Sequence, residues 1–123
     1  MPIEARLSDL PDGQRRAAEA VLAVLRKHSD LIIEAVAVGI LVKRNGSFIE
    51  LRPKTKWLDL SFISDEVIES PRIARIVEWP AGRAYFVHLT DKRDVDAELR
   101  RWLTTAIRGA SGRRKRAGSR GTG

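Results

Sequence analysis

The spacing of apolar residues predicts an amphipathic helix near each end of this chain. Between Pro11 and His28, apolar side chains recur at steps of three and four residues, which places them on one face of a helix. The same spacing returns from Val95 to Arg108, and Gly109 can then adopt the left-handed conformation that ends many helices. We therefore expect two helices, each with one apolar face available to a core.

Between these helices, short apolar or alternating runs separated by turn residues predict an antiparallel sheet. Asn45 and Gly46 favour the type I′ turn of a tight hairpin. Segment 39–44 could either extend the strand before it or form a separate crossing segment. The predicted fold is an α+β domain, with an antiparallel sheet of four or five strands and the N- and C-terminal helices packed on one face. The expected strands cover residues 31–38, 48–52, 57–63, 73–79 and 84–89.

Composition and charge divide the chain into a body and a basic tail. Its 123 residues, 43% of them hydrophobic, suffice for one core in the usual range of about 100 to 150 residues. Five of the 23 Lys and Arg residues, and none of the 16 acidic ones, lie in residues 110–123, so the net charge of +7 falls to +2 without them. Gly and Ser surround these cations, and segments rich in these residues are flexible. We predict one domain over residues 1–109 and a disordered basic arm over residues 110–123.

Several classes of protein are not supported by the sequence. The chain has no cysteine, so it has no disulfide framework, thiol nucleophile or thiolate metal site, which fits a reducing compartment. The first ten residues contain Glu4 and Asp9 and lack the apolar core of a signal peptide. The longest apolar run, Ala35 to Val42, is far shorter than the roughly 20 residues of a membrane span. We therefore expect a cytoplasmic protein with no membrane partner and no cofactor.

One stretch of the chain resembles a known family. Residues 48–62, with the sequence FIELRPKTKWLDLSF, resemble the signature hairpin of small bacterial domains of unknown function, some of them labelled predicted transport proteins. Segments 72–76 and 86–89, together with residues 94–99 and 102–103, resemble the closing strands and helix of that family. The resemblance implies an α+β domain with a helix at each end of an antiparallel sheet. Some members are joined to modules that look nuclease-like, which favours a role linked to nucleic acid.

The cations of the tail form the first candidate site. Lys and Arg side chains that neutralise phosphates release condensed counterions, so such a cluster favours polyanions without reading their sequence. The site predicts nucleic acid or another polyanion as partner, and the alternative is a tail that only increases solubility. Its residues are Arg113, Arg114, Lys115, Arg116 and Arg120.

The second candidate site lies on the face of the sheet opposite the helices. Aromatic rings beside cations can stack bases and hold phosphates, and an open sheet supplies the flat platform that stacking needs. The same rings could instead complete a secondary core or a dimer interface, because exposed aromatic patches usually mark association. The predicted nucleic-acid contacts are Arg52, Trp57, Phe86 and His88, with Asp59 beside them.

No catalytic residue and no metal site are predicted. His88 and Asp59 could pair as a base and its orienting carboxylate, but the sequence ties no hydroxyl to them as a nucleophile. Four carboxylates lie close together at the expected start of the second helix. A helix N-terminus favours negative charge, so these carboxylates are expected to cap the helix and not to bind a metal. This cluster is Asp91, Asp94, Asp96 and Glu98.

The sequence therefore predicts a small, non-enzymatic binding or accessory domain associated with nucleic acid. The first alternative is a homo-oligomeric interaction domain, for example a homodimer, with an aromatic residue at its interface. The second is a small-molecule binding protein or enzyme with a pocket in the sheet face. The first alternative would use Phe48, Trp57 or Phe86, and the second would use Trp57, Tyr85 and His88.

Overall fold

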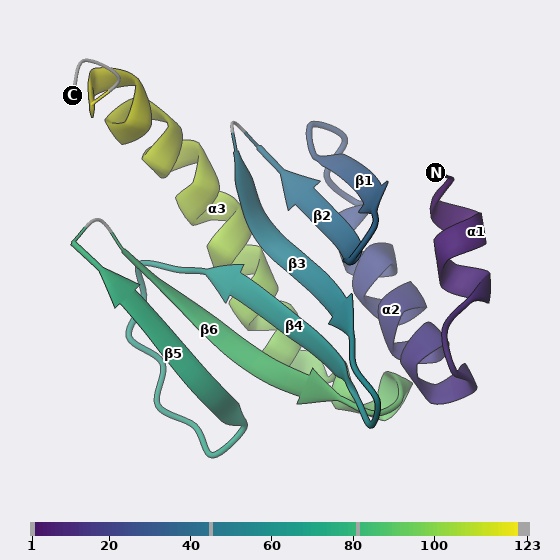
Figure 1. Ribbon diagram of the computed structural model, residues 1–123. Helices are drawn as coiled ribbons and strands as arrows, with labels where there is room; N and C mark the ends of the chain where they lie inside the picture. Colours follow the sequence, from purple (N-terminus) through teal and green to yellow (C-terminus); the bar gives the residue numbers. More distant parts are fainter. Residues whose placement is uncertain (1, 45, 81, 121–123) are drawn as a thin grey trace.

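A six-stranded antiparallel sheet with two long helices behind it forms the described part of the chain (Figure 1). The computed structural model describes residues 2–44, 46–80 and 82–120, with side chains described through residue 110. In chain order the elements are α1 (Ile3–Ser8), α2 (Asp12–Leu25), β1 (Ile32–Val36), β2 (Gly39–Lys43), β3 (Ser47–Pro53), β4 (Leu58–Ile63), β5 (Ile73–Trp79), β6 (Gly82–Leu89), the short 3-10 helix η1 (Lys92–Asp94) and α3 (Ala97–Arg120).

The strand order is β1-β2-β3-β4-β6-β5. Strands β1 to β4 therefore follow one another as neighbours in a meander, and the last two strands depart from this order. After β4 it passes to the far edge, forms β5 there, and returns as β6 between β4 and β5 (Figure 1). The predicted α+β class is confirmed. The predicted count of four or five strands is wrong, because segment 39–44 forms a strand of its own, β2, which pairs with β1 and β3.

The turn between β1 and β2 explains why this extra strand is hard to recognise. Val36 pairs with Gly39, so Ala37 and Val38 form the turn, and neither is a typical turn residue. The apolar run therefore continues through the turn without a break. Gly39 has a φ of 157° there, and its Cα lies against the backbone of Leu51, which leaves no room for a side chain.

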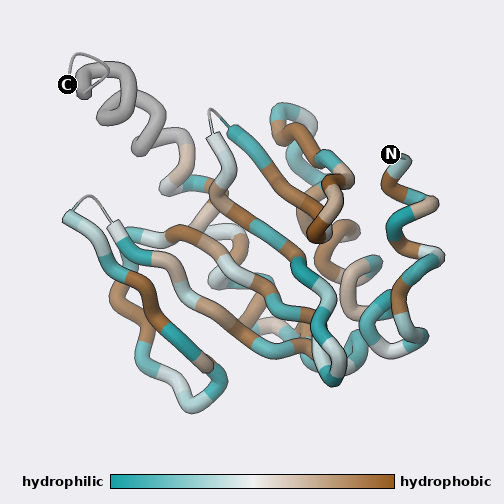
Figure 2. The backbone as a smooth tube through the Cα atoms, viewed as in Figure 1, coloured by the Kyte–Doolittle hydropathy of each residue, from teal (hydrophilic) through white to brown (hydrophobic). Residues whose placement is uncertain are grey.

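The core lies between the sheet and the helices α2 and α3. Along β4, Leu58, Leu60 and Phe62 are buried and alternate with less buried residues, as a sheet with one covered face requires. Trp102 of α3 lies with its ring centroid 6.2 Å from that of Phe62. In Figure 2, β2 is mainly hydrophobic, whereas β3 and β4 alternate between hydrophobic and hydrophilic residues.

The N-terminal region agrees with the predicted helix and adds a second one. The helix expected from Pro11 to His28 is α2, with Pro11 at its N-cap. The six-residue helix α1 was not predicted, because so short a segment carries little periodic signal. It is fixed to the edge of the sheet, since the Arg6 guanidinium donates to the carbonyls of Val36, at 2.6 Å, and Ala37, at 3.0 Å.

The C-terminal helix starts close to the predicted position but does not end where expected. Asp96 precedes α3, and its carboxylate accepts a hydrogen bond from the Leu99 amide at 3.0 Å. The predicted end at Gly109 is not observed, because the helix continues and Ala110, only 2% exposed, still packs into the core. Among the described residues, no helix is long and apolar enough to cross a bilayer.

Candidate functional site

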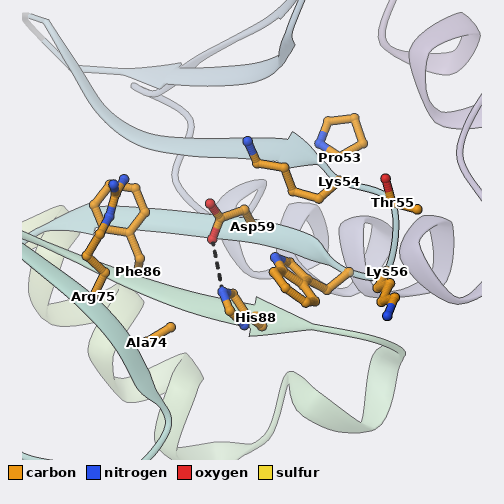
Figure 3. Close-up of a pocket in the computed structure, with 10 residues that line it drawn as sticks. Pro53, Lys54, Thr55, Lys56, Asp59, Ala74, Arg75, Phe86 and His88 are labelled. Atoms are coloured by element: carbon orange, nitrogen blue, oxygen red, sulfur yellow. Dashed lines mark ion pairs between the residues drawn. The ribbon is translucent and has the colours of Figure 1, made fainter.

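The uncovered face of the sheet carries a cleft of about 1050 Å³ (Figure 3). Its walls come from the turn between β3 and β4 and from strands β4, β5 and β6. It is lined by Pro53, Lys54, Thr55, Lys56, Trp57, Asp59, Ala74, Arg75, Phe86 and His88.

Strand register brings most of the predicted sheet-face residues together in this cleft. Asp59 pairs with His88 across β4 and β6, and Phe86 pairs with Arg75 across β6 and β5. Residues directly opposite each other in an antiparallel pair share a face, so these side chains project to the same side. Trp57 precedes β4 by one residue and lies on that side as well. The sheet face that the sequence predicts therefore exists as a cleft.

Two ring contacts give the cleft floor its shape. The rings of Trp57 and His88 are stacked, with centroids 4.0 Å apart and planes inclined by 16°. The guanidinium carbon of Arg75 lies 4.1 Å from the ring centroid of Phe86, within the range of a cation–π interaction. Each contact holds an aromatic ring in a fixed orientation, and the His88 side chain is still 39% exposed. The cleft thus presents preordered aromatic surface to solvent.

The turn that carries Lys54 and Lys56 is closed by a backbone hydrogen bond and anchored to α2 at Lys54. The Lys54 amide donates to the Trp57 carbonyl at 2.9 Å, which closes the turn. The Lys54 carbonyl in turn accepts a hydrogen bond from the Gln14 side chain at 2.8 Å, and Gln14, on α2, is only 4% exposed. These bonds fix the backbone of the turn, and both lysines are exposed and line the same cleft as Trp57 and His88.

The charge of the cleft is predominantly positive. Lys54, Lys56 and Arg75 line it together with a single carboxylate, that of Asp59. Within the described part of the chain, none of these three cations forms an ion pair, so their charges are not neutralised by the protein. Arg52 is different: it lies outside this cleft, and its guanidinium is 3.2 Å from Glu50. Arg52 lines a smaller adjoining cavity of about 180 Å³.

Asp59 occupies an unusual position for a carboxylate. Its side chain is 17% exposed, and its buried Oδ1 has no hydrogen-bond partner in the described structure. The nearest charged or titratable partner is the Nε2 atom of His88, at 4.0 Å, which is too long for a hydrogen bond. Arg52, directly opposite on β3, is engaged with Glu50 instead. The Asp59 carboxylate therefore has unused capacity to accept a hydrogen bond.

The cleft lacks the geometry of a nucleophilic active site. Thr55 is the one hydroxyl residue among those that line it, and no hydrogen bond joins it to His88 in the described residues. Of the residues named for the small-molecule alternative, Trp57 and His88 line the cleft, whereas Tyr85 is 1% exposed and faces the core. Phe48, one of the predicted interface residues, is 5% exposed.

The acidic cluster before α3 is engaged in local structure. Asp91 and Asp94 form the capping box of η1. The Arg16 guanidinium, 2.7 Å from Asp91, and the Lys92 amide hold the pKa of the Asp91 carboxyl well below its usual range. A hydrogen bond from the Leu99 amide likewise lowers the pKa of Asp96. In the described residues, no three His, Cys, Asp or Glu side chains are grouped as metal ligands.

The basic arm stays a prediction. The side chains of Arg113, Arg114, Lys115, Arg116 and Arg120 lie outside the described residues. The division of the chain into a domain over residues 1–109 and an arm over residues 110–123 stays a prediction, although the backbone of α3 runs through that boundary to Arg120.

Sequence reasoning missed the three cations of the cleft. The Lys-Thr-Lys sequence of the turn signals that Lys54 and Lys56 would lie close together, but only as exposed turn residues. Arg75 gives no such signal, because its place in the cleft depends on β5 pairing with β6. No family model, curated protein or solved structure matches this chain. The resemblance to small bacterial domains thus stays a prediction that rests on the residues quoted for it.

Proposed function

We propose that this chain is a non-enzymatic accessory domain that binds single-stranded nucleic acid in the sheet-face cleft. The observation that carries the proposal is the grouping of Lys54, Lys56 and Arg75, without ion-pair partners among the described residues, around the stacked rings of Trp57 and His88. Cations that follow a backbone and aromatic faces that stack bases are the two components of single-strand binding. The basic arm would supply a second, electrostatic contact.

A single strand fits this site better than a duplex does. Stacking on Trp57 or His88 requires a base with a free face, and bases inside a duplex have none to offer. The described part of the cleft also projects no helix or ribbon that could enter a major groove. The cleft would therefore bind unpaired nucleotides, with phosphates near the lysine turn and Arg75.

Trp57→Ala tests this proposal. Loss of one stacking contact costs about 1–3 kcal/mol per base, so affinity for a fluorescent oligonucleotide of about eight nucleotides should fall roughly 5- to 150-fold. Trp57→Phe keeps a ring and should keep most of the affinity. Trp79→Ala is the matched control, because Trp79 is 39% exposed on β5 and does not line the cleft. Equal affinities of the Trp57→Ala and Trp79→Ala proteins, both with native thermal unfolding, would refute binding in the cleft.

The contribution of the arm is separable from that of the cleft. Replacing the five arm cations by Gln should weaken binding of every oligonucleotide and leave the effect of Trp57→Ala unchanged. If the arm variant alone abolishes binding and Trp57→Ala has no effect, the arm is the site and the cleft is not.

A second candidate function, homodimerisation, is favoured by the exposed edge strand β5. The apolar side chains of Ile76, Val77 and Trp79 are 48%, 41% and 39% exposed, although β5 lies at an edge with an unpaired backbone. Such an edge can pair with the same strand of a second copy. Light scattering tests this: a dimer that Val77→Lys converts to a monomer supports it, and a monomeric wild-type chain at all accessible concentrations eliminates it.

A further inference from the structure

The Asp59 carboxylate is the feature of the cleft that phosphate binding does not explain. A negative charge among Lys54, Lys56 and Arg75 weakens their attraction for phosphate. A buried acceptor without a donor also carries a desolvation cost. Because Oδ1 itself is buried, a ligand can reach the carboxylate only through the rest of the side chain, which is 17% exposed, and a hydrogen bond donated there would offset part of that cost.

We propose that Asp59 gives the cleft a preference among bases, because its carboxylate accepts a hydrogen bond from the exocyclic amino group of a base stacked at Trp57 and His88. This inference rests on the proposed single-strand binding. Cytosine, adenine and guanine carry such an amino group, whereas uracil and thymine present a carbonyl oxygen at the position that cytosine uses for its amino group. A carboxylate accepts from the first kind of group and repels the second.

The position of Asp59 suits this role. It lies on β4 directly opposite His88 and two residues after Trp57, and Figure 3 shows its carboxylate directed toward the His88 ring. A base stacked beside these rings would therefore lie near the carboxylate. Neither basic neighbour donates a hydrogen bond to Oδ1, since Arg52 is held by Glu50 and His88 Nε2 stays 4.0 Å away. Asp59 lines both the main cleft and the smaller adjoining cavity, so it borders the path between them.

The other residues of the cleft do not distinguish cytosine from uracil. Both are single-ring pyrimidines, so stacking on Trp57 and His88 differs little between them. Contacts from Lys54 and Lys56 to phosphates are the same for both strands. The ratio of the two affinities therefore isolates the contact with Asp59 from everything else in the site.

The experiment compares oligocytidylate and oligouridylate RNAs of about eight nucleotides, at neutral pH and fixed salt, by fluorescence anisotropy on the full chain. The wild-type protein should bind the cytosine strand about tenfold more tightly, the value of roughly one hydrogen bond to a charged group. Asp59→Asn should reduce the ratio to within about twofold, because the amide can both donate and accept. Both absolute affinities should rise or stay measurable, since a negative charge is removed.

Glu34→Gln is the matched control. Glu34 is an exposed carboxylate on β1 that is paired with Lys43 at 2.7 Å and lines neither cavity, so its removal should leave the ratio near tenfold. Equal wild-type affinities for the two strands, or a cytosine preference that survives Asp59→Asn, would overturn the inference while single-strand binding itself stands. If neither strand binds, the proposed function fails, and the base preference fails with it.

Discussion

The salt dependence of binding measures how many phosphates the lysine turn contacts. Lys54 and Lys56 are exposed, line the cleft, and form no ion pair among the described residues, so both can neutralise phosphates of a bound strand. Each phosphate contact to a single strand contributes about −0.7 to the slope of log K against log salt concentration. Lys54→Gln combined with Lys56→Gln should therefore make the slope less steep by about 1.4.

This change in slope corresponds to a measurable change in affinity. Between about 50 and 200 mM salt, the wild-type protein should lose roughly sevenfold more affinity than the double variant does. Fluorescence anisotropy titrations at several salt concentrations supply both slopes. The turn itself should be preserved, because the backbone bonds of Lys54 to Trp57 and Gln14 do not involve the lysine side chains.

A second double variant controls for net charge. Arg26 and Lys27 are exposed at the C-terminal end of α2, on the helix-covered side of the sheet (Figure 1). Replacing both by Gln removes the same charge and should change the slope by far less than 1 unit, since screening weakens distant charges. An equal change of slope in the two variants, or none in the lysine-turn variant, would refute phosphate contacts at the turn.

Three further perturbations test the fold that supports the cleft. Tyr85→Phe removes a buried hydroxyl that donates to the Glu66 carbonyl at 2.9 Å and accepts from the Ile68 amide at 3.0 Å. It should lower the free energy of unfolding by about 1–3 kcal/mol in urea titrations, and an unchanged free energy of unfolding would contradict this. Gly39→Ala should cost more than about 1 kcal/mol, because φ is positive and the new methyl group would overlap the Leu51 carbonyl; a stability equal to that of the wild type would argue against this backbone. The Arg16 contact lowers the pKa of Asp91, so the stabilising effect of this carboxylate is complete above the unfolded pKa of about 4 and is lost as pH falls toward the lower folded pKa. Asp91→Asn should therefore make the melting temperature fall less steeply in acid, and an identical fall in the two proteins would exclude this linkage.

The local features of the site could be predicted because they depend on neighbours in the chain. Trp57, Asp59, Phe86 and His88 were selected from alternation along single strands, which has a period of two residues and needs no knowledge of the partner strand. The structure brings these four residues, which were expected on one face of the sheet, into one cleft. Arg52 lies on the same face, but its ion pair with Glu50 draws it to the adjoining cavity.

Other features could not be predicted, because they depend on contacts between distant segments. The separate strand β2 follows a turn of Ala37 and Val38, whose apolar side chains give no signal of a break. The continuation of α3 past Gly109 depends on the burial of Ala110 in a core that the sequence does not display. Tyr85 was assigned to a pocket with His88, although residues of opposite parity on one strand face opposite sides.

The sequence by itself determined the α+β class, most of the strands, and the aromatic residues of the outer face, because helical and strand periodicities are local properties. Only the tertiary structure decided that β6 lies between β4 and β5, and this order sets His88 beside Asp59 and Arg75 above Phe86. Strand order depends on which strands pair over long sequence separations. The alternation of apolar and polar residues along one β-strand is the same for every strand order, so it cannot reveal that order. The cleft, its three cations and the position of the Asp59 carboxylate beside His88 are consequences of that one choice.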